Sequence, residues 1–128
     1  MANPAPGFAR NPDHRVDLVP ETHRVRVTFG GAVIADSHDA LRVEETNHEP
    51  VYYVPEKDVR TELLRPTDHT THCPFKGDAS YWTIEVPGGQ GRRAENAVWG
   101  YRTPFDETAG LAGYYAFYKS RVDAIEVE

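Results

Sequence analysis

Apolar and polar residues alternate along several short segments of the chain, which is the pattern of half-buried β-strands. In residues 23–29, Val25, Val27 and Phe29 fall on one side of such a strand, and arginine and threonine fall on the other. A Gly-Gly pair follows, which is typical of a two-residue hairpin turn. The same kinds of pattern predict further strands in residues 32–37, 40–45, 50–54, 79–86 and 96–101, and two more within 114–128.

One segment has the pattern of a short helix. Residues 55–66 begin with a proline, carry acidic residues in the first turn and end at a second proline, as many helices do. Val59 and Leu63 would form its buried side. The segment therefore predicts a helix of about two turns in a chain that is otherwise mostly β.

The chain divides into an arm and one domain. Residues 1–21 contain four prolines and little periodicity, so we expect an extended N-terminal arm, ordered where Phe8 or Leu18 finds a pocket. Residues 22–128 are then a single domain, as the total length of 128 residues also indicates.

The composition argues against several classes of function. The net charge is −6, and no basic run offers the footprint that nucleic-acid binding requires. No apolar stretch approaches the roughly 20 residues of a membrane helix, and the N-terminus lacks a signal-peptide core. Cys73 is the only cysteine, which excludes an internal disulfide and a four-cysteine zinc site. We therefore expect a cytoplasmic protein without structural zinc, with neither nucleic acid nor a membrane as its partner.

The chain lacks the usual phosphate-binding and nucleophile motifs. The glycine-rich residues 88–91 precede two arginines, but no helix follows them and no Gly-x-x-x-x-Gly-Lys pattern is present. A hairpin loop is the better interpretation. The chain also lacks a Gly-x-Ser-x-Gly elbow. We expect no cofactor.

The stretch THCPFKGDASYW contains a Cys-Pro-x-Lys-Gly turn. Proline sets φ for a tight turn and Gly77 supplies a backbone conformation that other residues avoid, so the turn can be purely structural, with Cys73 as inert support. The alternative is a functional turn in which Lys76 acts as acid, base or charge stabiliser. A nearby ammonium would also lower the pKa of the Cys73 thiol.

A metal site is a second interpretation of the same region. His69, His72 and Cys73 are all good zinc ligands, and His48 or Glu49 could complete the set. Neighbouring residues on a strand point to opposite faces, which makes it hard to direct these side chains at one ion. We therefore expect no metal, and keep a metal-dependent hydrolase as the weakest alternative.

Aromatic residues are concentrated in the second half of the chain, where strand alternation places them on both faces of the predicted strands. One face must be core, and the other can be a second covered surface or an aromatic pocket. Glu44 and Asp58 could supply acid and base chemistry with Lys76 if the sheet curls.

The ordered segments VRVTFGGAVIADSHDALRVEE, PVYYVPEKDV, THCPFKGDASYW, AVWGYRTP and GYYAFYKSRVD resemble domain of unknown function family 427, found in bacteria and fungi. The resemblance covers residues 23 to 126 and implies a β-tent-like fold of two antiparallel sheets. The family has also carried a nucleotidyltransferase label. The chain has no paired aspartates on a predicted strand, so its sequence gives that label no support. Its recurring positions match Glu44, Tyr53, Pro55, Asp58, Cys73, Lys76, Gly77, Tyr81, Trp99 and Phe117.

Together these patterns predict small-molecule binding in an aromatic cleft beside the Cys-Pro-x-Lys-Gly turn. Lys76, Glu44 and Asp58 would be catalytic if the protein is a metal-independent enzyme, and Tyr53, Cys73, Tyr81, Trp99 and Tyr101 would bind the ligand. The alternative is a binding module without catalysis. An exposed edge strand would also allow a homodimer.

Overall fold

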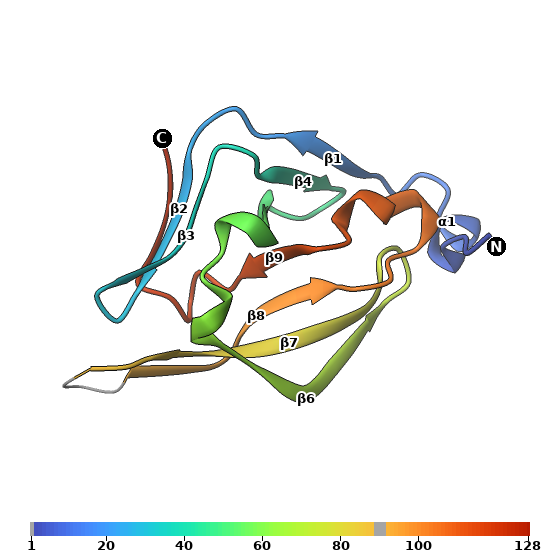
Figure 1. Ribbon diagram of the computed structural model, residues 1–128. Helices are drawn as coiled ribbons and strands as arrows, with labels where there is room; N and C mark the ends of the chain where they lie inside the picture. Colours follow the sequence, from blue (N-terminus) through green and yellow to red (C-terminus); the bar gives the residue numbers. More distant parts are fainter. Residues whose placement is uncertain (1, 89–91) are drawn as a thin grey trace.

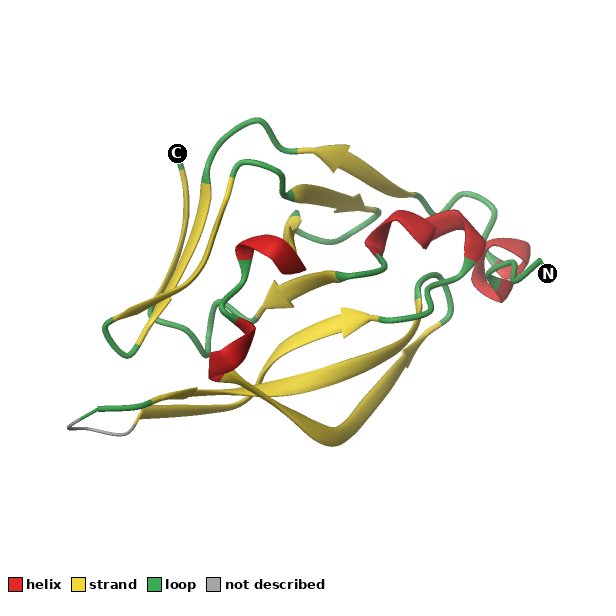
Figure 2. Ribbon diagram, viewed as in Figure 1, coloured by secondary structure: helices red, strands yellow, loops and turns green. Residues whose placement is uncertain are grey.

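Two antiparallel β-sheets make up the protein, as a computed structural model that describes residues 2–88 and 92–128 shows (Figures 1 and 2). The hairpin loop expected at residues 88–91 lies mostly outside the described residues. The large sheet has seven strands, which are, in spatial order, β1 (Val16–Pro20), β4 (Leu41–Glu45), β5 (Val51–Pro55), β9 (Tyr114–Phe117), β8 (Arg92–Tyr101), β7 (Gly77–Val86) and β6 (Leu64–Cys73).

The small sheet has three strands, β10 (Ala124–Val127), β2 (Val25–Phe29) and β3 (Ala32–Ser37), in that order. Gly30 and Gly31 join β2 to β3 with φ angles of 60° and 81°, the positive values that a type I′ hairpin turn requires. The prediction of a mostly β domain with two antiparallel sheets is confirmed.

The large sheet is covered on one face by the small sheet. Ile84 and Val98 of the large sheet are fully buried in one cluster with Val25 and Val27 of the small sheet. The opposite face carries a second buried cluster, which includes Val43, Tyr53, Tyr81 and Tyr101. Both faces of β7 and β8 are therefore covered, and the alternation of aromatic residues along them reflects two different environments.

The helix expected over residues 55–66 does not form, and this prediction is wrong. Two short 3₁₀ helices, η1 (Glu56–Asp58) and η2 (Thr61–Leu63), occupy half of the segment, and β6 begins at Leu64. The prolines and acidic residues that favour the start and end of a helix are equally compatible with single turns. Leu64 pairs with Ile84 of β7, so the chain enters the sheet at that residue.

Strand β6 was missed by the sequence analysis, because most of its residues are exposed on both faces and lack apolar alternation. It is an edge strand, held by pairing with β7 that is interrupted between Pro66 and Thr70. Figure 1 shows the resulting bend in β6. Pro66 fits such a position, because an edge strand tolerates a residue without an N–H donor.

The first 21 residues are more structured than the extended arm that we expected. They contain a short helix, α1 (Pro6–Arg10), and the edge strand β1, which pairs with β4. Phe8 of α1 packs edge-on against Phe75, with 5.0 Å between ring centroids. Leu18 of β1 lies beside Gly110 in the 3₁₀ helix η3 (Asp106–Leu111), where a Cβ on the glycine would come within 3.2 Å of the leucine. No helix in the described part of the chain is long and apolar enough to cross a membrane.

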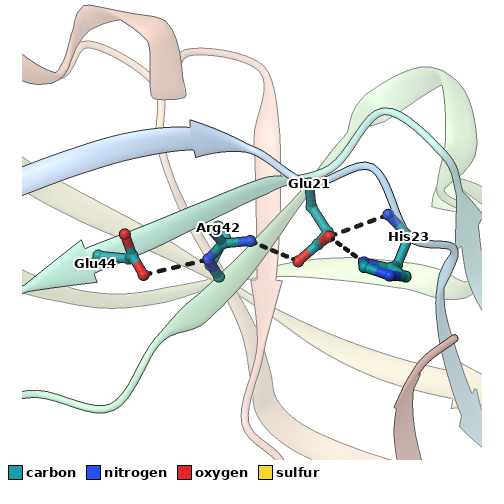
Figure 3. Close-up of polar contacts among 4 residues, drawn as sticks. All are labelled: Glu21, His23, Arg42 and Glu44. Atoms are coloured by element: carbon teal, nitrogen blue, oxygen red, sulfur yellow. Dashed lines mark hydrogen bonds and ion pairs between the residues drawn. The ribbon is translucent and has the colours of Figure 1, made fainter.

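A buried carboxylate fixes the connection between β1 and β2 (Figure 3). Glu21 is only 5 % exposed. It accepts hydrogen bonds from the backbone N–H of His23 at 3.0 Å and from the Arg42 guanidinium at 2.8 Å, and its carboxylate lies 2.9 Å from the His23 ring. The bond from the His23 backbone, followed by the contacts with the His23 ring and Arg42, lowers the pKa of Glu21 from 4.5 to about 2.

This network makes stability depend on pH in a defined direction. Between pH 4.5 and about 2, Glu21 is ionised when folded and protonated when unfolded, so its contribution is complete above pH 4.5 and is lost as the pH falls toward 2. We predict that Glu21→Gln flattens the dependence of the free energy of unfolding on pH over this range, as urea titrations would measure. Glu44→Gln, at the exposed end of the same network, is the control and should retain the wild-type slope. An equal slope in wild type and Glu21→Gln would contradict the assignment.

Candidate functional site

A pocket of about 780 Å³ opens on the face of the large sheet that carries the second buried cluster. We call it the aromatic pocket; its chemically distinctive lining residues are Tyr53, Tyr81, Trp99, Tyr101, Tyr118, Cys73, Lys76, Glu45, His14 and His48. Its volume is in the range of pockets that hold small molecules.

The structure brings most of the predicted site residues together. Lys76 lines the aromatic pocket, and so do all the residues predicted to bind a ligand: Tyr53, Cys73, Tyr81, Trp99 and Tyr101. They come from β5, the end of β6, the β6–β7 connection, β7 and β8, which the sheet places along one surface. The alternation of residues along each strand accounts for this grouping, because Tyr81 pairs directly with Trp99 in the β7–β8 ladder.

The aromatic wall is held by contacts among its own rings. The indole N–H of Trp99 donates to the Tyr53 hydroxyl at 3.2 Å, with the two rings perpendicular and 6.1 Å apart. Trp99 also packs on Tyr118, with 4.4 Å between centroids. Burial raises the pKa of both Tyr53 and Tyr101 well above the ordinary value of 10. These hydroxyls are therefore neutral at physiological pH and present hydrogen-bonding groups without charge.

An ion pair between Lys76 and Glu45 lies in the same pocket. Lys76 is 8 % exposed and the Glu45 side chain 12 %, and the lysine ammonium donates to the Oε1 atom of Glu45. Burial by itself raises the pKa of Glu45, but the hydrogen bonds with Lys76 and His14 outweigh it and hold the pKa below 4.5. Glu45 therefore stays ionised at neutral pH and supports a charged lysine.

The pair joins parts of the large sheet that are not neighbours. Glu45 ends β4, whereas Lys76 lies just before β7, and β5, β9 and β8 separate these strands in the sheet. Direct contact across this interval requires the sheet to curve around the pocket. The sheet therefore has the curl that we expected to be needed for acid and base chemistry. The acid that this curl brings to Lys76 is Glu45 and not Glu44.

His14 completes this polar group from the N-terminal segment. Its Nε2 atom lies 2.8 Å from Oε2 of Glu45, and its ring stacks on Phe75 at 3.9 Å between centroids. His48 is farther away, with Nε2 at 3.9 Å from the same carboxylate oxygen. Both carboxylate oxygens of Glu45 therefore have partners, Lys76 on one and His14 on the other.

The Cys-Pro-x-Lys-Gly turn positions Lys76 through its backbone. Gly77 has a φ of 120°, which side chains other than hydrogen rarely permit. The carbonyl of Pro74 accepts a hydrogen bond from the Gly7 N–H at 3.0 Å, and the carbonyl of Lys76 accepts one from the Phe105 N–H at 2.9 Å. The turn is therefore held from two sides. It is a structural turn that also places Lys76 in the pocket wall, so the two interpretations of the motif are compatible.

Glu44 and Asp58 do not lie in the aromatic pocket, which corrects the predicted grouping. Glu44 is on the opposite face of β4 from Glu45 and is half exposed, at 3.4 Å from the Arg42 guanidinium (Figure 3). Asp58 lies in η1, where it accepts hydrogen bonds from Ser37 and Lys57. Strand alternation alone separates Glu44 from Val43 and Glu45.

The proposed metal ligands also do not converge. His72 and Cys73 both line the aromatic pocket, but the His72 ring forms an exposed pair with Asp78 at 2.7 Å. His69 packs edge-on against the Tyr81 ring instead. Within residues 2–88 and 92–128, no group of three or more histidine, cysteine or acidic side chains is arranged to hold a metal ion.

Comparison with known families gives one match, to the model of the family described as Domain of unknown function (DUF427), over residues 17–128. It confirms the resemblance inferred from the sequence motifs. His14 lies outside the matched residues, whereas the other residues of the pocket named above lie inside them. No curated protein matches the chain.

The buried ion pair leads to a prediction about stability. Glu45→Ala leaves the Lys76 ammonium in the pocket wall without its counter-charge, and we expect the free energy of unfolding at pH 7 to fall by about 3 kcal/mol. The neighbouring Glu44→Ala should change it by less than about 0.5 kcal/mol, because Glu44 is at the surface. Urea denaturation of the two variants measures both values. Equal effects of the two substitutions would show that the Lys76–Glu45 pair is energetically unimportant.

Proposed function

The chain belongs to the DUF427 family, and we propose that it binds a small molecule in the aromatic pocket through an oxygen atom of the ligand that accepts hydrogen bonds from Lys76. The observation that carries the proposal is the buried lysine ammonium on the wall of an aromatic pocket. An ammonium has three donors, and one of them is used by Glu45 among the described residues. The two remaining donors favour a carbonyl, carboxylate or phosphate oxygen as the partner.

The aromatic wall supports a ligand with a flat or apolar body. Tyr53, Tyr81, Tyr101 and Trp99 offer ring surface with a few neutral polar atoms, which is the usual composition of small-ligand sites. Glu45 neutralises the charge of Lys76, so the pocket does not depend on a strongly anionic ligand. The net charge of −6 likewise argues against a nucleic-acid partner. A cytoplasmic location and a homodimer through an open sheet edge are further parts of this proposal.

Catalysis is the second candidate function. The observation that favours it is the chain of contacts from His14 through Glu45 to Lys76 on the pocket wall. Such a chain can hold a proton at the Nζ atom of Lys76 and support acid or base chemistry on a bound ligand without a metal. Conversion of a bound compound by the wild-type protein, followed by NMR, separates an enzyme from a binding module.

A thermal-shift screen against a panel of small carbonyl, carboxylate, phosphate and amine compounds tests the proposal. At ten times the Kd, binding adds about 1.4 kcal/mol, so oxygen-acceptor compounds should raise the Tm by a few degrees. The test variant carries both Lys76→Met and Glu45→Gln, which removes the two charges together and avoids leaving one unpaired. Its ligand-induced shift should disappear.

Lys57→Met is the matched control, because Lys57 is an exposed lysine paired with Asp39 that does not line the aromatic pocket. It should keep the wild-type shift. Equal stabilisation of the double variant and the wild type would overturn the role of Lys76, as would a panel in which only the amines bind. An arm with a chelator addresses the metal alternative, since loss of the shift with chelator alone would favour a metal site instead.

A further inference from the structure

A second hollow adjoins the aromatic pocket. It encloses about 450 Å³, and we call it the apolar groove; the residues that it does not share with the pocket are Pro50, Tyr52, Phe117, Lys119, Ile125 and Val127. These residues come from β5 and the residue before it, from the end of β9 and the connection that follows it, and from β10, which is an edge strand of the small sheet. The groove therefore lies where the two sheets approach each other, beside the aromatic pocket.

The pocket and the groove have a common wall. Glu49, Val51, Trp99 and Tyr118 line both, and the rings of Trp99 and Tyr118 pack against each other as described above. Tyr118 follows β9 directly, and its backbone N–H donates to the Ala97 carbonyl at 2.9 Å. A ligand that touches Trp99 and Tyr118 from the pocket therefore lies next to the groove.

The two hollows differ in chemistry. The aromatic pocket contains the buried Lys76–Glu45 pair. Among the described residues, the charged groups of the groove are Glu49 and Lys119, which are exposed and paired with each other at 3.0 Å. The rest of its lining is mainly apolar, and Val127 is unusual among the large apolar side chains in being 40 % exposed. A polar hollow and an apolar hollow that share wall residues fit a molecule that has the same two parts.

We propose that the ligand is an acyl compound, whose carbonyl or carboxylate head accepts hydrogen bonds from Lys76 and whose apolar chain passes the Trp99–Tyr118 wall into the apolar groove. The inference rests on the proposed function and names its ligand class. It also gives the exposed Val127 a role, because burial of its side chain against an apolar chain removes that surface from water.

The two tryptophans of the chain provide the measurement. Trp99 lines both hollows, whereas Trp82 lies in the core cluster on the other face of the large sheet. The indole N–H signals in ¹H–¹⁵N NMR spectra, assigned with Trp99→Phe, would be followed during titration with acetate, butanoate, hexanoate and octanoate, and with the corresponding amides. We expect the Trp99 signal to shift while the Trp82 signal stays in place, and the Kd to fall roughly fourfold for each added methylene until the groove is filled. The two series show whether a charged or a neutral acyl head is preferred.

Val127→Asp tests the groove without altering the aromatic pocket. It should remove the dependence of the Kd on chain length, while Val33→Asp, at a comparably exposed valine of β3, should retain it.

A Kd independent of chain length, with a Trp99 shift that still requires Lys76, would overturn the acyl-chain inference and leave the proposed function in place. The absence of any Trp99 shift would overturn the inference as well, and the thermal-shift panel then decides the proposed function separately. A groove that is instead covered by a second copy of the chain would show as a dimer by light scattering that Val127→Asp dissociates, which would also overturn the inference.

Discussion

The ion pair between Lys76 and Glu45 connects distant parts of the large sheet, and the shape of the aromatic pocket depends on it. Three strands separate β4 from β7, so the pair can form only when the sheet curves, and its burial makes each charge depend on the other. The small sheet covers one face of this curved sheet with apolar residues. The other face carries the second buried cluster, the aromatic side chains of the pocket and the ion pair.

Much of the fold could be predicted from the sequence, because the strands of the two sheets alternate in the way that half-buried strands do. The failures have local causes. Strand β6 is an exposed edge with little apolar content, so its conformation is determined by pairing with β7 rather than by its own pattern. Residues 55–66 satisfy the rules for a helix start and stop, but tertiary pairing at Leu64 takes precedence over these local preferences.

The candidate site was predictable where it follows strand alternation, and not where it depends on long-range closure. Alternation assigns Tyr81 to one face of its strand and Trp99 with Tyr101 to one face of theirs. The pairing of Tyr81 with Trp99 in the β7–β8 ladder then places both on the same side of the sheet. Glu45 shares the side of Val43 by the same alternation, and an acid at such a position was a signal that the sequence analysis did not use. His14 could not have been found, because the N-terminal segment reaches the pocket through tertiary contacts such as the stack on Phe75.

A direct measurement of the ion pair tests this account most sharply. The side-chain carboxyl carbon of Glu45 can be followed by ¹³C NMR as the pH is lowered, with the exposed Glu44 as a reference in the same spectra. The account predicts a pKa for Glu45 below 4.5 that rises in Lys76→Met, because the variant removes a hydrogen-bond donor and a positive charge while the carboxyl stays buried. A pKa at or above 4.5 in the wild type, or one unchanged in Lys76→Met, would contradict the central role given to the pair.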